Sequence, residues 1–249
     1  MKLLSRLLLA GLCALFAHAA SADQIKLLAT VGYKPVLVDL LRSYEKQSRN
    51  RVLVDYDSPA GLARRIGRGE TFDLVIMSED GLEKMLGDRK IVDDSITPLA
   101  KAGIGVAIQT NAKQPDLSSI EGFRRTLLAA RAVAYTSPNV GGVFYSQLFQ
   151  RLGILSEIER KSVPVVGGYA AQKVAGNQAD IALAPASEII VVPGARYAGP
   201  IPEVLQSYTT YSAAIGLRAK DSDAVTDLMS WLSSGELEPL LRARGMELP

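Results

Sequence analysis

In "IKLLATVGYKPVLVDLLRSYEKQS" (Ile25 to Ser48), a short apolar run is followed by a polar break and then by apolar residues at helical spacing. The run from Ile25 to Thr30 is typical of a β-strand, and the spacing from Lys34 to Ser48 predicts an amphipathic α-helix. Pro35 falls in the first turn of that helix, where its missing N–H breaks no hydrogen bond. The stretch therefore predicts one βα unit.

The same alternation of strand and helix patterns continues to the end of the chain. Repeated βα units imply a parallel-rich sheet with helices on its faces, so the predicted fold class is α/β. The other predicted strands cover residues 51–57, 72–78, 102–111, 132–137, 159–166, 179–185 and 208–219. The other predicted helices cover residues 60–69, 79–89 and 119–130, a segment after Gly142, a segment after Gly168, and two segments within 222–246, while residues 193–206 read as a proline-rich connector.

Two long apolar segments, residues 102–111 and 208–219, bracket the middle of the chain. If both cross between two lobes, the first lobe comprises residues 23–104 with 208–249, and the second comprises residues 105–207. A chain of this kind forms a two-lobed clamp with a ligand cleft between the lobes. One continuous α/β sheet is the alternative that the composition leaves open.

Residues 1–22 have the pattern of a secretory signal peptide. Lys2 and Arg6 flank the start of an apolar stretch that runs to Phe16, and Ala20-Ser21-Ala22 supplies a small-residue cleavage pattern. The apolar stretch is too short to span a membrane as a stable helix. We expect cleavage near Ala22 and release of the mature chain into a periplasm.

The expected mature chain lacks the side chains of several common catalytic sites. Cys13 and His18 are the single cysteine and the single histidine of the sequence, and both lie in the predicted signal. Thiolate chemistry, disulfides, Ser-His-Asp catalysis and His or Cys metal sites are thereby excluded, and we expect neither a metal nor a cofactor. Once Lys2 and Arg6 are removed with the signal, 26 of the 28 basic residues remain and are balanced by 26 acidic ones. This charge balance argues against nucleic acid or a membrane surface as a partner.

Four stretches of the chain carry a family pattern. They are "IKLLATVGYKPVLVDLLRSYEK", "SPAGLARRIGRGETFDLVIMSEDGLEKML", the Gly-Gly turn with "RLGI" after it, and "WLSSGELEPLLRARGM". Together they resemble the periplasmic molybdate-binding proteins, a family of transporter-linked solute receptors, over nearly the whole expected mature chain. The resemblance implies a type II-like solute-binding fold in which each lobe is a parallel-rich sheet flanked by helices.

The positions at which that family holds its anion differ in this sequence. In register with the family, Gly32, Pro59 and about Pro185 stand where the family has two serines and a tyrosine. Gly32 keeps a backbone N–H, whereas Pro59 has none to donate. We therefore expect an anion other than molybdate or tungstate, and the chain looks closer to a divergent branch that also resembles periplasmic aconitate isomerases.

A glycine-rich turn, "SPNVGG" (Ser137 to Gly142), joins a predicted strand to a predicted helix. At a helix start, Asn139, Gly141 and Gly142 can leave backbone N–H groups free, and these donors together with the helix dipole favour an anion. Ser137 and these three residues are predicted ligand contacts. The alternative is an ordinary tight turn in which Ser137 or Asn139 caps the helix.

A second Gly-Gly pair precedes the next predicted helix. Gly167 and Gly168 repeat the arrangement, and Tyr169, placed in the first helical turn, has a phenol that can donate to a carboxylate. These three residues are predicted to face the same cleft. The alternative is a plain loop with Tyr169 as a packing aromatic.

The end of the first predicted strand supplies the first lobe's candidates. Thr30 and Gly32 offer hydrogen-bond donors, Tyr33 offers a phenol, and Lys34 offers a cation at a helix start. A lysine there is unfavourable to the helix dipole, so a carboxylate ligand would give it a partner. The alternative for Lys34 is a solvated side chain.

Four further residues complete the predicted site. Ser58 adds a hydroxyl, and Arg64 has the planar guanidinium that suits a carboxylate, although a solvent-facing side chain is the alternative. Ser187 and Glu188 follow a predicted strand. Glu188 can act as a general base if it is shielded from water, or it can be exposed at the strand end.

These residues predict a monomeric receptor that clamps a small anion, an organic carboxylate or an oxyanion, and presents it to the membrane permease of an ABC-type transporter. The resemblance also implies an alternative, which is a cofactor-independent isomerase that moves an allylic proton between trans- and cis-aconitate. The candidate bases for that reaction are Lys34, Tyr169 and Glu188. A signalling receptor that hands its closed form to a sensor protein stays open as a third reading.

Overall fold

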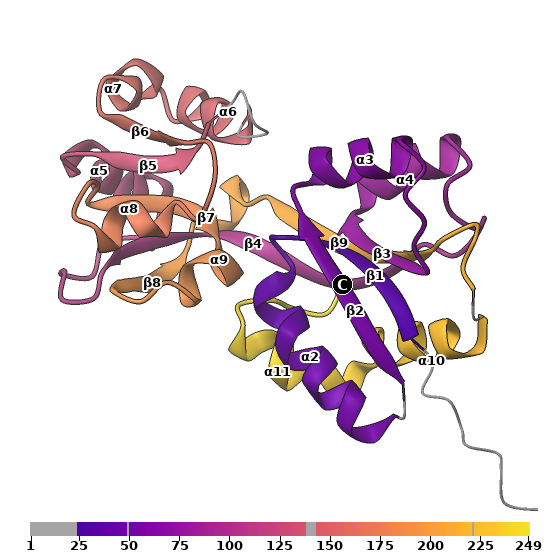
Figure 1. The fold of residues 1–249 in the computed structure, drawn as a ribbon. Coiled ribbons are helices and arrows are strands. Elements are labelled where there is room, and N and C mark those ends of the chain that lie inside the picture. Colours follow the sequence, from indigo (N-terminus) through magenta and orange to yellow (C-terminus); the bar gives the residue numbers. More distant parts are fainter. Residues whose placement is uncertain (1–23, 49, 138–142, 221) are drawn as a thin grey trace, which may run out of the picture.

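The computed structural model describes residues 24–48, 50–137, 143–220 and 222–249. The predicted signal segment and three predicted ligand residues, Asn139, Gly141 and Gly142, lie outside the described residues. Figure 1 shows two bodies of sheet and helix joined by long strands, which confirms the predicted two-lobed α/β fold. Within the described ranges no helix is long and apolar enough to cross a membrane.

The first body, which we call lobe 1, contains both the first and the last elements of the chain. Its elements are β1 (Gln24–Thr30), α2 (Lys34–Gln47), β2 (Arg51–Asp57), α3 (Pro59–Gly67), β3 (Leu74–Ser78), α4 (Glu79–Gly87), the first half of β4 (Thr97–Gln109), β9 (Tyr208–Ile215), α10 (Ser222–Leu232), a 3₁₀ turn η3 (Gly235–Leu237) and α11 (Glu238–Ala243). The strand order is β2-β1-β3-β9-β4, with β1 parallel to β2 and β3, and β9 antiparallel to both of its neighbours. Helices α3 and α4 cover one face, and α2, α10 and α11 cover the other (Figure 1).

The second body, lobe 2, is built on the second half of β4. Its other elements are α5 (Ile120–Ala129), β5 (Val133–Thr136), α6 (Val143–Arg151), α7 (Leu155–Glu159), β6 (Ser162–Val165), α8 (Ala171–Ala175), β7 (Ile181–Pro185), α9 (Ala186–Ile190), β8 (Ala195–Pro200) and a 3₁₀ turn η2 (Glu203–Leu205). The strand order is β4-β7-β5-β6, and β8 pairs with the other edge of β4. The β5-β6 and β5-β7 pairs are parallel, as the predicted βα units require.

Strand β4 changes partners where it passes from one lobe to the other. Its residues up to Gly103 pair with β9, and those from Ile104 onward pair with β7. The side chain of Gln206, in the connector before β9, accepts a hydrogen bond from the Ile104 N–H at 2.7 Å and donates one to the Ile104 carbonyl at 3.0 Å. The two crossing segments are thus tied together at this point. The lobe limits themselves, residues 23–104 with 208–249 against residues 105–207, remain our proposal.

The core of each lobe lies on both faces of its sheet, because successive side chains of a strand point in opposite directions. In β1, Leu27 belongs to the core cluster that contains Leu40 of α2, while Leu28 belongs to the cluster that contains Leu62 of α3. Lobe 2 has the same two-sided arrangement around β7. This packing holds the strand ends, and the loops that follow them, in place.

Two predictions for the last quarter of the chain were wrong. The proline-rich connector 193–206 contains the strand β8, which was missed because Gly199 and Pro200 are residue types depleted from strands. As an edge strand paired only with β4, β8 tolerates them. The strand predicted at 208–219 ends at Ile215, and Gly216 follows with its Cα packed against the carbonyl of Phe72, where an added Cβ would lie 2.3 Å from the oxygen.

Candidate functional site

The carboxyl ends of strands from the two lobes face each other across the lobe boundary. Gly32 follows β1 in lobe 1, and Glu188 lies in α9, directly after β7 in lobe 2. A Cβ atom added to Gly32 would lie 3.5 Å from Glu188 Oε1, so the two residues are in contact. In α/β folds, ligands bind in crevices beyond the carboxyl ends of strands, and this contact is such a place.

Tyr211 of β9 is the third member of this contact. A Cβ atom at Gly32 would lie 2.6 Å from the Tyr211 hydroxyl oxygen, which no unstrained side chain allows. The Tyr211 ring in turn lies against that of Tyr33, with ring centroids 5.3 Å apart. Glycine at position 32 therefore lets a phenol and a carboxyl group approach the same stretch of backbone.

Three tyrosines, Tyr145, Tyr169 and Tyr211, lie within electrostatic reach of the Glu188 carboxyl group, and Tyr33 lies against Tyr211. Burial raises the pKa of Tyr33, Tyr145, Tyr169 and Tyr211, and the negative charge of Glu188 contributes to the raised pKa of the last three. These phenols accordingly stay neutral at any physiological pH and keep their O–H donors. We call Gly32, Tyr33, Tyr145, Tyr169, Glu188 and Tyr211 the interlobe cluster.

Glu188 has an unusual ionisation within this cluster. Burial raises its pKa from 4.5 to about 7, because a charged carboxylate loses its hydration there. No lysine or arginine in the described part of the chain forms an ion pair with it. Near neutral pH the group is therefore present both as an acid that donates a hydrogen bond and as a carboxylate that accepts a proton.

Four buried side-chain oxygens in the described residues have no hydrogen-bond partner, and all of them adjoin the interlobe cluster in sequence. They are Thr30 Oγ1, Tyr33 Oη, Ser187 Oγ and Ser212 Oγ. Thr30 and Tyr33 flank Gly32 within two residues, Ser187 precedes Glu188, and Ser212 follows Tyr211. Buried polar groups without partners are uncommon in proteins and call for a functional explanation. A ligand bound at Gly32 and Glu188 would supply partners for Thr30, Tyr33 and Ser187, whereas Ser212 points to the opposite face of β9 from Tyr211.

Three predicted site residues have other contacts in the structure. The exposed Lys34 lies with its Nζ 5.0 Å from the centroid of the Tyr56 ring, on β2. The Ser58 hydroxyl oxygen accepts a hydrogen bond from the Gly61 N–H at 3.0 Å, so Ser58 is the N-cap of α3. Arg64 is exposed in the last turn of α3. The structure does not bring these three side chains to Glu188.

The second Gly-Gly pair differs from its prediction. Helix α8 begins at Ala171, so Tyr169 lies before the helix and not in its first turn. Gly168 adopts a φ of 75°, and the Tyr169 N–H donates to Gln172 Oε1 at 3.2 Å instead of remaining free. The phenol of Tyr169, rather than its backbone, is thus what this segment presents near Glu188.

Two other predictions are corrected in detail. Ser187 and Glu188 follow β7, and they lie in the short helix α9, which was not predicted, because the chain turns into a helix directly after Pro185. Ser137 is buried, and its backbone N–H donates to the Val165 carbonyl at 2.9 Å, so that group is not available to a ligand.

Tyr145 and Tyr211 were not identified from the sequence. Tyr145 lies on the buried side of α6, and Tyr211 lies in an apolar strand, so both match the pattern of ordinary core residues. The sequence signal that could have singled out Tyr211 is the polar "YTTYS" at the start of an otherwise apolar strand. In the described ranges, no group of three or more His, Cys, Asp and Glu side chains could hold a metal ion.

Comparison with known proteins gives one family and several relatives. The model of the bacterial extracellular solute-binding proteins matches residues 25–247. Aconitate isomerase from a Pseudomonas species is 27% identical over 235 residues, covering 92% of this chain and 89% of that protein.

Two solved structures share the fold at lower identity. The substrate-binding domain of a putative molybdenum ABC transporter from Clostridium difficile is 16% identical, with a TM-score of 0.75 and coverage of 92% of this chain and 100% of that one. The periplasmic molybdate-binding protein of Azotobacter vinelandii is 19% identical, with a TM-score of 0.74 and coverage of 90% and 99%.

Proposed function

Because the chain belongs to the family of bacterial extracellular solute-binding proteins, we propose that it binds a small carboxylate anion at the interlobe cluster, in the periplasm, and presents it to a membrane permease. The observation that carries this proposal is the contact of Glu188 in lobe 2 with Gly32 in lobe 1, beside the hydroxyl of Tyr211. A ligand held there touches both lobes, so its binding favours their closed arrangement.

The side chains at this place suit a carboxylate. Phenols and hydroxyls donate hydrogen bonds without adding charge, and Thr30, Tyr33 and Ser187 have oxygens with no other partner. Two relatives that share the fold are linked by name to molybdenum or molybdate. The glycine at position 32 and the proline at position 59 support a different anion for this chain, because Pro59 has no N–H to donate.

A ligand panel tests the proposed class of anion. The mature protein is titrated with citrate, cis-aconitate, trans-aconitate, sulfate, molybdate and tungstate, and its melting temperature is followed. We expect stabilisation by one or more of the carboxylates, of about 2.7 kcal/mol at one hundred times the dissociation constant. Stabilisation by molybdate or tungstate alone would contradict the proposal.

A matched pair of valine substitutions tests the site. Gly32→Val places a side chain against the Tyr211 hydroxyl and Glu188, whereas Gly87→Val, at the end of α4, meets nothing within 4 Å. We expect Gly32→Val to lower the affinity for the carboxylate at least tenfold and Gly87→Val to leave that affinity unchanged. Both variants should have circular dichroism spectra like that of the parent protein. Unchanged affinity in Gly32→Val would place the ligand elsewhere.

The ionisation of Glu188 favours a second candidate, an isomerase of a small tricarboxylate. A carboxyl group with a pKa of about 7 can take up and return a proton at neutral pH. In this reaction the Glu188 carboxylate removes a proton from the methylene carbon of trans-aconitate, the double bond moves by one position, and the same proton returns to the other end of the allyl unit to give cis-aconitate. The relative named aconitate isomerase supports this candidate.

Turnover separates the two candidates. Metal-free protein is incubated with trans-aconitate, and the cis isomer is measured together with binding. For the isomerase, Glu188→Gln abolishes turnover but keeps binding, and Lys34→Gln changes neither, because Lys34 lies over Tyr56. Binding without turnover in the parent protein supports the receptor, and turnover that persists in Glu188→Gln would assign the base to another residue.

A further inference from the structure

Two hollows lie side by side at the opposite end of lobe 1 from the interlobe cluster. Their volumes are about 160 and 140 Å³, and they share Thr71, Phe72 and Arg218 in their walls. The smaller hollow adjoins the amino ends of β1 and β3, and the larger one adjoins the amino end of β3, whereas Gly32 follows the carboxyl end of β1. A seven-residue strand separates these ends by about 20 Å, so the hollows are distinct from the proposed ligand site.

The walls of these hollows carry positive charge without ion-pair partners. Arg89 and Lys90 line the larger hollow, Lys220 lines the smaller one, and Arg218 lines both. None of these four forms an ion pair with a carboxylate in the described ranges, whereas most other arginines there do. The hollows therefore bring together four cations that no carboxylate of the described residues pairs with.

The two nearby carboxylates are already engaged and do not neutralise these cations. Hydrogen bonds from Arg65 and Lys26 lower the pKa of Glu70 to about 2, which keeps it charged and held by them. Asp73 is buried and accepts hydrogen bonds from the backbone N–H groups of Lys26 and Lys220 at 2.7 and 2.9 Å. Both carboxylates thus stabilise the local structure and form no ion pair with the four unpaired cations of the hollows.

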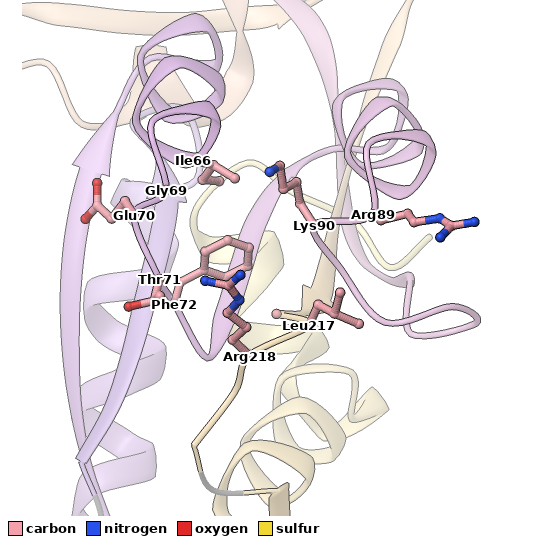
Figure 2. Close-up of a pocket in the computed structure, with 10 residues that line it drawn as sticks. Ile66, Gly69, Glu70, Thr71, Phe72, Arg89, Lys90, Leu217 and Arg218 are labelled. Carbon is pink, nitrogen blue, oxygen red and sulfur yellow. The ribbon is translucent and has the colours of Figure 1, made fainter.

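The arrangement of side chains in the larger hollow suits a compact anion. In Figure 2, Arg218 rises beside Phe72 and Lys90 reaches in from the opposite wall, while Glu70 and Arg89 point away from the centre. A guanidinium offers a planar pair of donors to a phosphate, and an ammonium adds a point charge. The volume of about 160 Å³ equals roughly five water molecules, which is room for one phosphate group.

We propose that this hollow is a second anion site, in which Arg218 and Lys90 bind a phosphate group. The group can belong to free inorganic phosphate or to the headgroup of an anionic phospholipid, and the chemistry of recognition is the same for both. Because Arg218 is exposed and Lys90 is only half-buried, added salt weakens the interaction.

Binding of inorganic phosphate to the mature protein, measured by calorimetry at low ionic strength, tests the site. We expect Arg218→Gln and Lys90→Gln each to lower the affinity for phosphate at least fivefold. Arg68→Gln is the matched control, because Arg68 is an exposed arginine at the end of α3 that does not line the hollow, and we expect less than a twofold change. An equal loss in all three variants would overturn the proposal in favour of general charge attraction.

Flotation with vesicles of phosphatidylglycerol, and of phosphatidylcholine as the neutral comparison, distinguishes the two sources. If the protein floats with phosphatidylglycerol vesicles but not with phosphatidylcholine vesicles, and Arg218→Gln abolishes this flotation, the ligand is a lipid headgroup. If the protein binds phosphate but floats with neither kind of vesicle, the ligand is a free anion. Gly32→Val reports on the other site, since phosphate binding that is lost there but kept in Arg218→Gln would assign the phosphate to the interlobe cluster and overturn the proposal. Absence of both phosphate binding and flotation would also overturn it.

Discussion

At the scale of single residues, Glu188 links protonation to stability because its pKa differs between the folded and unfolded chain. Burial raises that pKa from 4.5 to about 7. The folded state therefore binds the Glu188 proton more tightly than the unfolded state does. The contribution of this protonation to the free energy of unfolding is complete below about pH 4.5 and is lost as the pH rises through 7. Above that pH the charged carboxylate costs the fold at most about 3 kcal/mol.

Replacement of Glu188 by glutamine is therefore expected to raise the free energy of unfolding at pH 8, by at most about 3 kcal/mol, and to give no gain at pH 4.5. Urea unfolding of both proteins at the two pH values measures this difference. Glu83→Gln, at an exposed position of α4, is the control and should behave alike at both pH values. If the difference in unfolding free energy between Glu188→Gln and the parent protein is the same at both pH values, burial of Glu188 is not the cause of the pH dependence.

Ligand binding should depend on the same group. As the pH rises through about 7, Glu188 becomes negatively charged and repels a bound carboxylate, so the affinity for that ligand is expected to fall. In Glu188→Gln this dependence should disappear, because the amide does not ionise. Calorimetric titrations at pH 6, 7 and 8 measure the affinity of both proteins. If the affinity changes with pH in the same way in both, another group causes the pH dependence of ligand binding.

Part of the interlobe cluster could be predicted from the sequence and part could not. Gly32, Tyr33 and Glu188 follow strands whose ends are visible in the apolar pattern, and ligands of α/β folds bind beyond the carboxyl ends of strands. Tyr145 and Tyr211 lie inside a helix and a strand, where a tyrosine has the same pattern whether it lines a site or fills a core. Their role depends on how the two lobes meet, which no local pattern contains.

At the scale of elements, the cap of α3 offers a test of what Ser58 does. Its hydroxyl accepts a hydrogen bond from Gly61 N–H at 3.0 Å, and Ser119 caps α5 in the same way through Gly122 N–H, also at 3.0 Å. We expect Ser58→Ala and Ser119→Ala each to lower the free energy of unfolding by about 1 kcal/mol.

Denaturant unfolding measures the loss in both variants, and ligand titration follows. If Ser58 serves only as a cap, both variants bind the ligand like the parent protein. A loss of affinity in Ser58→Ala alone would return Ser58 to the ligand site as first predicted.

The limits of strands were harder to predict than their existence. The βα units of lobe 1 could be predicted because β1 and β3 are strong apolar runs and each is followed by an amphipathic helix. The edge strand β8 could not, since its Gly199 and Pro200 mimic a loop and only its pairing with β4 makes it a strand. The short helix α7 was missed as well, because five residues give no helical period.

At the scale of the whole molecule, the pairing of Gln206 with Ile104 should influence how the lobes move. Gln206→Ala removes both hydrogen bonds at the crossing, so we expect a loss of about 1–2 kcal/mol in unfolding free energy and a larger radius of gyration without ligand. Small-angle scattering with and without ligand measures the second effect.

Gln114 is the matched control because it also bridges two segments, but within lobe 2. Its side chain donates to the Ala198 carbonyl at 2.6 Å and accepts from Arg196 at 2.8 Å. Gln114→Ala should cost a similar amount of stability and leave the radius of gyration unchanged. If both variants expand equally, the crossing has no special influence on the lobes.

The position of β9 in the lobe 1 sheet also governs the order in which the molecule can be completed. The strands of lobe 2 are all present once the chain has been made as far as Pro200, but β3 and β4 of lobe 1 stay apart until Tyr208–Ile215 is inserted between them. Until then each has an unpaired edge, which invites pairing with other chains. The newly made chain therefore passes through an interval of exposure to aggregation that ends only when its last strand, β9, is in place.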